Sequence, residues 1–186
     1  MKILVTGRVA SGKDTVISLL NKKLGYFIID ADKIGHSLLN DKTIIQAIIN
    51  FLPNTLDKGV INRHLLSDAV FSSKEILQKL NLIIHPKLIS EINNQITTHH
   101  DNFIINAAIA EELDLLHKGL FIINVNASNK NIIDRLTGRG VKTQKAQNIL
   151  DSQQKAKWYK SIANVTINNN GSKEDLEKEI SKKLAL

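Results

Sequence analysis

Residues 6–15 read TGRVASGKDT and contain the spacing G-x-x-x-x-G-K at Gly7, Gly12 and Lys13. Glycines in this pattern let backbone N–H groups curl round phosphate oxygens, and the lysine adds a mobile positive charge. The pattern carries weight only where it links a strand to a helix. The stretch therefore predicts a phosphate-binding loop (P-loop) for a nucleoside triphosphate, provided that its flanks have those structures.

The flanking segments have the required character. Residues 2–6 form a short apolar run, residues 13–24 carry apolar side chains at helical spacing, and residues 26–30 form a second apolar run. Together they predict a strand–loop–helix–strand unit. Further strands are predicted at 102–106, 119–127 and 164–168, and further helices at 129–136, 142–157 and 173–184. Ser128 is the expected N-cap of the first of these helices, and Ser172 with Asp175 gives a capping-box-like start to the last. Alternating strands and helices predict an α/β fold of three layers, in which helices flank a parallel sheet of about five strands.

One segment is too long for an ordinary connection between strands. Residues 31–101 are mostly helical in pattern, so we interpret them as a helical insert at one edge of the sheet. They contain both prolines of the chain, and Pro86, next to His85, is expected to end or kink its helix. Residues 1–186 are otherwise expected to form a single domain.

Composition excludes several classes of protein. No apolar run reaches the length of a membrane span, the N-terminus lacks the features of a signal peptide, and there is no cysteine for a disulfide. We therefore expect a cytoplasmic protein without a membrane partner. The net charge of +7 favours a polyanionic ligand, but the basic residues are scattered, so no nucleic-acid partner is expected. The oligomeric state is not predicted.

Asp14 stands where such a loop usually has a hydroxyl for Mg²⁺, and Thr15 follows one position later. The carboxylate could share in Mg²⁺ coordination, since hard cations accept carboxylate oxygen readily. Alternatively, it points away from the phosphates, which backbone N–H groups and Thr15 then hold, because a carboxylate repels phosphate when no metal lies between them. The residue sequence favours the second alternative without excluding the first.

Two carboxylates follow the second predicted strand, at Asp30 and Asp32. The carboxyl ends of parallel strands face the ligand crevice, where one carboxylate could accept the proton of an attacking hydroxyl and the other could organise Mg²⁺. Asp30 could instead cap the next helix. We take Asp32 as the candidate base. Asp30 is a candidate metal ligand that is also expected to have a structural role as a helix cap.

Three arginines are candidates to clamp the transferred phosphate: Arg8, Arg135 and Arg139. Arg135 and Arg139 lie four residues apart on a predicted helix, and glycines flank the second of them. An arginine on a closing segment can neutralise charge in a phosphoryl-transfer transition state. We therefore predict a lid at 136–157, although two exposed arginines near a helix end would give the same pattern.

The chain resembles the dephospho-CoA kinase family, which uses Mg²⁺-ATP to phosphorylate the 3′-hydroxyl of dephospho-CoA. The resemblance rests on stretches that run through most of the chain, namely TGRVASGKDT, FIIDADKIGHSLL, GVINRHLLSDAVF, LNLIIHPKLISEI, IIDRLTGRG and QQKAKWYKSIANVTINNNGS. It implies a P-loop kinase with ATP and Mg²⁺ as cofactors, whose helical insert binds the acceptor.

The resemblance also implies roles for individual residues. ATP would lie on Gly7, Arg8, Val9, Ala10, Ser11, Gly12, Lys13, Asp14 and Thr15, with Arg135 beside its phosphates and Asn170 and Gly171 beside its adenine. Lys13, Asp32 and Arg139 would be catalytic. Asp32, Arg63, His85, Pro86 and Glu112 would hold the acceptor, and Asp14 and Asp30 are the candidate metal ligands.

The chain departs from the family pattern at the phosphate site. The family has glycine at positions 8 and 10, a hydroxyl residue at 14 and an acid at 106, where this chain has Arg8, Ala10, Asp14 and Asn106. Two other functions therefore stay open. One is a different small-molecule kinase, such as a nucleoside monophosphate kinase, and the other is a nucleotide- or nucleic-acid-binding module whose catalytic parts have decayed.

Overall fold

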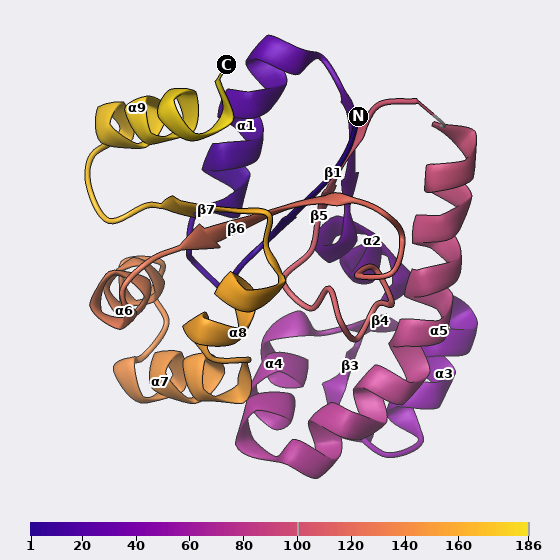
Figure 1. Ribbon diagram of the computed structural model, residues 1–186. Helices are drawn as coiled ribbons and strands as arrows, with labels where there is room; N and C mark the ends of the chain where they lie inside the picture. Colours follow the sequence, from indigo (N-terminus) through magenta and orange to yellow (C-terminus); the bar gives the residue numbers. More distant parts are fainter. Residues whose placement is uncertain (100, 186) are drawn as a thin grey trace. The chain divides into compact units, whose positions relative to one another are not determined.

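The computed structural model describes residues 1–99 and 101–185 (Figure 1). It divides into two compact units, of which unit 1 comprises Met1–Ile29 and Thr98–Leu186 and unit 2 comprises Asp30–Thr97. Residue 100 of the predicted insert at 31–101, and the last residue of the chain, lie outside the described residues.

Unit 1 is built on a five-stranded parallel sheet, as predicted. The strands are β1 (Lys2–Thr6), β2 (Phe27–Asp30), β5 (Phe103–Asn106), β6 (Phe121–Asn126) and β7 (Val165–Asn168), in the spatial order β2-β5-β1-β6-β7. In the central register, Leu4 of β1 lies between Ile105 of β5 and Ile122 of β6. The central strands are continuous apolar runs because both of their faces are buried.

Helices cover the sheet on both sides. On one face, α1 (Lys13–Leu24) and α9 (Lys173–Leu184) pack Val16, Leu20, Leu176 and Ile180 against inward-facing residues of the strands. Figure 1 shows α8 (Ala156–Ile162) on the opposite side of β6. Ser172 opens α9 with a capping box that includes Asp175, which confirms the start predicted from the sequence. Among the described helices, none is both long and apolar enough to cross a lipid bilayer.

The single helix predicted at 142–157 is wrong. The chain forms α7 (Thr143–Ser152) and α8, with an extended break that begins at Gln153. The side chain of Gln153 accepts a hydrogen bond from the backbone N–H of Val9 at 2.8 Å, and Gln154 donates one to Glu111 at 3.3 Å. These tertiary contacts override a helical pattern that is continuous in the sequence. Before the break, α7 packs against α6 (Asn129–Thr137), which Ser128 caps as predicted.

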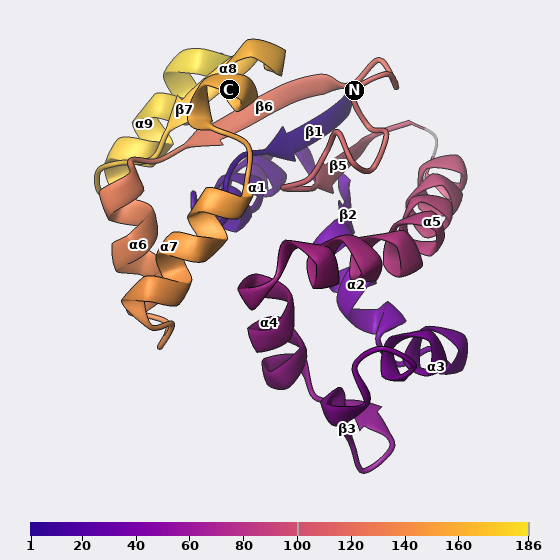
Figure 2. The ribbon, with the colours of Figure 1, turned by 90° about the horizontal axis from the view of Figure 1, so that it is seen from below.

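Unit 2 is mainly helical, with α2 (Ala31–Leu38), α3 (Lys42–Ile49), α4 (Arg63–Ser72) and α5 (Lys74–Thr98, its last residue in unit 1) (Figure 2). Its core gathers Ile44, Ile48, Leu66, Val70 and Leu80. A 3₁₀ turn (Pro53–Thr55) precedes a small hairpin of β3 (Leu56–Asp57) and β4 (Val60–Ile61), which the helical interpretation did not predict. Its turn, Lys58-Gly59, has positive φ at both residues, which is the conformation that tight hairpins use.

Pro86 lies inside α5 and does not end it. Figure 1 shows that the α5 ribbon changes direction along its length. The backbone carbonyl that loses its partner to a proline belongs to the residue four positions earlier, Leu82, and this residue is strongly exposed. Water can therefore replace the lost hydrogen bond, which is why the helix continues.

Candidate functional site

The P-loop connects β1 to α1, so the context that the motif requires is present. Gly12 is the N-cap residue of α1 and has left-handed backbone dihedral angles, φ 99° and ψ 27°. No described side chain caps this helix. A helix N-terminus of this kind combines directed N–H groups with partial positive charge, and both favour a bound phosphate.

The side chain of Lys13 lies over the loop. The side chain is buried, and its Nζ donates hydrogen bonds to the backbone carbonyls of Gly7 at 3.1 Å and Arg8 at 3.2 Å. The ammonium group is therefore folded over the loop that it is predicted to serve. A point charge on a flexible stem can exchange these carbonyls for phosphate oxygens with little change elsewhere.

Arg8 fastens the loop to the segment that follows β6. Its Nη1 donates to Oδ1 of Asn129 at 2.6 Å, and its Nη2 donates to the carbonyl of Ala127 at 2.8 Å. Burial lowers the pKa of the guanidinium, an effect that Tyr159 partly opposes. The side chain thus has protein partners on both terminal nitrogens, and its predicted contact with phosphate stays a prediction.

Arg135 of α6 braces the loop from a second side. Its Nη1 donates to the carbonyls of Ala10 at 3.1 Å and Ser11 at 3.0 Å, while Nη2 donates to the carbonyl of Asn169 at 2.8 Å. Burial lowers the pKa of Arg135, and the nearby charge of Arg139 lowers it further. Arg139 itself is exposed in the turn between α6 and α7. Two neighbouring cations next to the P-loop favour an anionic ligand.

The loop after β7 closes this side of the site. The buried Asn169 donates through Nδ2 to the carbonyl of Ser11 at 2.8 Å. Asn170 accepts through Oδ1 a hydrogen bond from the N–H of Ser128 at 2.8 Å, so the predicted adenine segment, Asn170 and Gly171, is tied to the start of α6. Asn170 and Gly171 are exposed.

Asp14 contacts the end of β5. The side-chain amide of Asn106 donates through Nδ2 to Oδ1 of Asp14 at 2.8 Å. Asn106 is buried, whereas Asp14 and its neighbour Thr15 are exposed in the first turn of α1. Two of the departures from the family pattern, Asp14 and Asn106, are therefore direct neighbours.

Three buried side-chain oxygens have no hydrogen-bond partner in the described part of the chain. They are Oγ1 of Thr6, Oγ of Ser11 and Oδ1 of Asn106. All three belong to the P-loop or to the carboxyl ends of β1 and β5. Since a buried polar group without a partner costs free energy, their concentration here is the pattern expected of a site that a ligand completes.

Glu112 lies in the segment after β5, where it is exposed. Its charge helps to raise the pKa of Tyr159 to about 12, after the larger effect of burial and against the opposing charge of Arg8. The hydroxyl of Tyr159 donates to the carbonyl of Ala108 at 3.0 Å, which ties α8 to the same segment.

The remaining predicted residues belong to unit 2. Asp30 caps α2, because its Oδ1 accepts a hydrogen bond from the N–H of Lys33 at 3.0 Å, and this confirms the capping alternative. Asp32 is exposed in the first turn of α2. Arg63 opens α4, and its Nη2 donates to the carbonyl of His36 at 3.2 Å.

His85 and Pro86 lie in the middle of α5. The candidates thus form two sets, one around the P-loop in unit 1 and one in unit 2. Within the first set, the hydrogen bonds described above tie Lys13 and Arg135 to carbonyls of the P-loop, whereas Arg139, Glu112 and Thr15 take no part in them.

Sequence reasoning missed three residues that shape the P-loop: Asn129, Gln153 and Asn169. Each hydrogen-bonds the loop or its arginine from a position more than 100 residues away. Only Asn169 had a usable signal, because it precedes the predicted adenine residues within a run of three asparagines.

Comparison with known proteins agrees with this geometry. Residues 1–175 match the family model described as dephospho-CoA kinase. A dephospho-CoA kinase of Borreliella burgdorferi is 36% identical, over 97% of this chain and 91% of its own. That of Dehalococcoides mccartyi is 35% identical, over 95% and 93%. The solved structure of a dephospho-CoA kinase from Campylobacter jejuni superimposes with a TM-score of 0.67 at 28% identity, covering 97% of this chain and 93% of that one.

Proposed function

The chain belongs to the dephospho-CoA kinase family and transfers a phosphoryl group from ATP to dephospho-CoA, and from this premise we propose how its own residues carry out the reaction. The acceptor atom is the 3′-hydroxyl oxygen, and the products are coenzyme A and ADP. The observation that carries the proposal is the position of Lys13, buried over the carbonyls of the P-loop that leads into α1. We also infer that the protein works in the cytoplasm.

The P-loop residues Gly7 to Thr15 hold the phosphates of ATP. Backbone N–H groups and the N-terminus of α1 bind the phosphate oxygens, and Lys13 moves from the loop carbonyls to the β- and γ-phosphates. Arg135 keeps the loop in shape through its three carbonyl partners. Asn170 and Gly171, beside the start of α6, lie next to the adenine.

Arg139 supplies positive charge to the transition state. In phosphoryl transfer, negative charge spreads over the three equatorial oxygens of the transferred group, and an arginine that approaches it lowers the barrier. The exposure of Arg139 in a turn between two helices, and its like charge close to Arg135, support this role. Residues 136–157 then act as the lid that brings Arg139 to the phosphates.

Residues 31–101 bind the acceptor, and Asp32 removes the proton from its 3′-hydroxyl. A carboxylate in an exposed first turn can reach a ligand and can accept the proton that leaves as the hydroxyl oxygen attacks phosphorus. Arg63, His85 and Pro86 hold the rest of the acceptor, and Glu112 is a further candidate for acceptor binding. Arg63 suits the pyrophosphate of dephospho-CoA because its guanidinium can bind two oxygens at once.

Mg²⁺ fits the residues around the P-loop, where a carboxylate, an amide and two hydroxyl oxygens lie at the loop and the strand ends. Asp14 would hold the ion, and Asp30 is the second candidate, although its Oδ1 already caps α2. When bound, the ion neutralises charge on the β- and γ-phosphates. No described group of three or more His, Cys, Asp or Glu side chains could hold a metal by itself, so water and phosphate oxygens would complete its shell.

A coupled assay of ADP release tests the proposal with dephospho-CoA, AMP, CMP and dTMP offered in parallel. We expect turnover with dephospho-CoA and Mg²⁺-ATP, and background rates with the three nucleotides. ADP release only with a nucleoside monophosphate would overturn the choice of acceptor. ATP binding without turnover on any acceptor would instead identify a decayed module.

A further inference from the structure

The hydrogen bond between Asn106 and Asp14 joins a rigid donor to an accessible carboxylate. Asn106 is 2% exposed at the end of β5, whereas Asp14 is exposed in the first turn of α1. Only Oδ1 of Asp14 takes part in this contact. Asn106 therefore fixes the direction of the carboxylate of an exposed residue, and Oδ2 takes no part in this contact.

A carboxylate at this position is unfavourable for binding of phosphate alone. At about 4 Å, two like charges repel by about 1 kcal/mol even in bulk water, and by more near a protein surface. A divalent cation between them reverses the sign of the interaction. The partial positive charge at the start of α1 stabilises the carboxylate itself.

The two departures from the family pattern compensate each other. The resemblance implies a hydroxyl residue at position 14 and an acid at position 106, whereas this chain has the acid at 14 and a neutral amide at 106. Both arrangements place one carboxylate at this point. An acid at both positions would put two carboxylates within hydrogen-bond distance of each other, which is strongly unfavourable unless one is protonated.

We propose that Asp14 and Asn106 are one exchanged pair, in which Asp14 supplies the carboxylate for Mg²⁺ and Asn106 positions it. The unpartnered Oδ1 of the buried Asn106 lies in the same amide group, which supports a ligand at this point. The proposal names Asp14 as a metal-binding residue and Asn106 as a positioning residue. It rests on the proposed use of Mg²⁺-ATP.

Binding of a non-hydrolysable ATP analogue, measured by calorimetry in EDTA and over a series of Mg²⁺ concentrations, tests the proposal without turnover. Asp14→Asn keeps the shape of the side chain and can still bond Asn106. We expect it to raise the Mg²⁺ concentration for half-maximal binding roughly tenfold. In EDTA the same variant should bind the analogue a few-fold more tightly than the wild type, because the repulsion is gone. Electron paramagnetic resonance of Mn²⁺ reports the loss of cation affinity directly.

The exchange itself is tested with Asp14→Ser, Asn106→Asp and the double variant. Each single change should raise the Mg²⁺ concentration for half-maximal binding. Asp14→Ser removes the carboxylate, and Asn106→Asp places two carboxylates side by side, where they repel and displace each other. The double variant should recover most of the wild-type midpoint, because it returns the single carboxylate to β5. Glu177→Gln on α9, exposed and equally a loss of one negative charge, is the control and should change nothing.

Three results would overturn the proposal. Asp14→Asn could weaken binding equally with and without Mg²⁺, which is the behaviour of a purely structural residue. The double variant could be no better than the worse single variant, which would show that the two positions are independent. If the wild type bound the analogue equally well in EDTA and in Mg²⁺, the proposed use of Mg²⁺ would itself be wrong.

Discussion

Asn169 donates a hydrogen bond from its side-chain amide to the backbone carbonyl of Ser11 at 2.8 Å, across 158 positions of the sequence. This contact brings the loop after β7 so close to the P-loop that Gly12, the residue after Ser11, has no room for a side chain. A Cβ atom at Gly12 would lie 2.0 Å from Nδ2 of Asn169. The shape of the P-loop therefore depends on the C-terminal part of the chain as well as on its own glycines.

Gly12→Ala should destabilise the protein and weaken ATP binding by more than about tenfold, which corresponds to about 1.4 kcal/mol. Alanine would have to adopt a φ of +99° and to displace Asn169, which also moves the carbonyl of Ser11. The measurements are urea unfolding and ATP titration. Gly119→Ala is the matched control, because Gly119 has a φ of +64° with nothing within 4 Å of its Cβ position. It should lose about 1–2 kcal/mol of stability and no affinity. Equal losses in the two variants would contradict the close approach of Asn169.

Substitutions of Arg135, in the last turn of α6, and of Arg139, in the turn after it, should have different effects. Arg135 should matter for stability and Arg139 for catalysis. Arg135→Lys cannot keep three carbonyl contacts with one ammonium, so we expect a loss of about 1–3 kcal/mol in the free energy of unfolding. Arg139→Lys should change stability by less than about 0.5 kcal/mol, since its side chain is exposed. It should nevertheless lower kcat about a hundredfold or more, because in the proposed mechanism Arg139 acts only in the transition state. Urea unfolding and steady-state kinetics on both variants decide the matter. A normal kcat in Arg139→Lys would remove Arg139 from the catalytic residues.

Local sequence patterns predicted the elements whose formation depends on neighbours in the chain. The strand before Gly7, the helix from Lys13 to Leu24 and the caps at Ser128 and Ser172 all follow from residues within a few positions. The parallel sheet followed from continuous apolar runs, since only strands buried on both faces can be apolar throughout. These are the features that propensity and periodicity determine.

Contacts between distant segments were not predictable in the same way. The break at Gln153 depends on a backbone N–H of Val9, and no periodicity between 142 and 157 indicates it. The pairing of Asp14 with Asn106 likewise appears only when β5 lies beside β1. The hairpin turn at Lys58-Gly59 contains a glycine, which is a local signal for a turn, but the interpretation of residues 31–101 as mostly helical did not use it.

Asp32→Asn should lower kcat by about 10²- to 10⁴-fold while the affinity for ATP changes little. The amide has nearly the shape of the carboxylate but cannot accept the proton of the 3′-hydroxyl. Coupled ADP release gives kcat, and calorimetry with ATP alone gives the affinity. Asp57→Asn, an exposed acid in the hairpin of the same unit, should leave both unchanged. If Asp32→Asn kept the wild-type kcat, another group would have to be the base.

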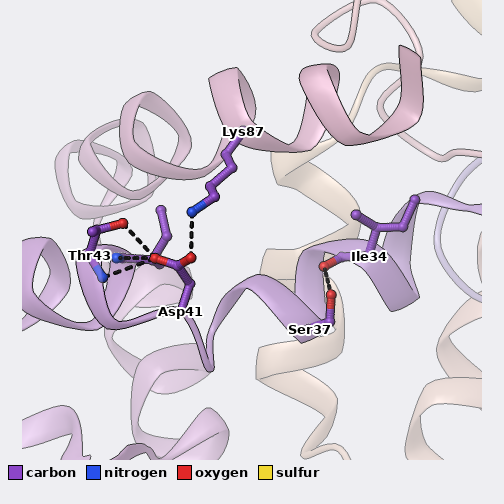
Figure 3. A network of polar contacts seen from close by, with 6 residues as sticks. Ile34, Ser37, Asp41, Thr43 and Lys87 are labelled. Atoms are coloured by element: carbon purple, nitrogen blue, oxygen red, sulfur yellow. Dashed lines mark hydrogen bonds and ion pairs between the residues drawn. The ribbon is translucent and has the colours of Figure 1, made fainter. Parts of the chain in front are cut away.

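The stability of unit 2 should depend on pH through Asp41. This residue caps α3 by accepting hydrogen bonds from the N–H groups of Thr43 and Ile44. Its carboxylate also accepts a hydrogen bond from Nζ of Lys87 on α5, with which it forms an ion pair (Figure 3). The hydrogen bond from Lys87 is the largest of the causes that hold the pKa of Asp41 well below its usual range, ahead of those from Thr43 and Ile44. A carboxylate whose pKa is depressed in the folded state contributes stability above its unfolded pKa of about 3.9, and loses that contribution as the pH falls towards the folded value.

Lys87→Met should therefore lower the melting temperature at pH 7, and its deficit relative to the wild type should shrink as the pH falls below about 4. The variant removes the ammonium partner but keeps an apolar stem of similar length on α5, so the remaining change reports the charge of the pair. Thermal unfolding followed by circular dichroism between pH 7 and pH 3 gives the melting temperature of the variant and of the wild type at each pH. Lys79→Met, an exposed lysine of the same helix, controls for the loss of one positive charge and should run parallel to the wild type. A deficit in Lys87→Met that stayed constant over this range would show that Lys87 acts through packing and not through the carboxylate of Asp41.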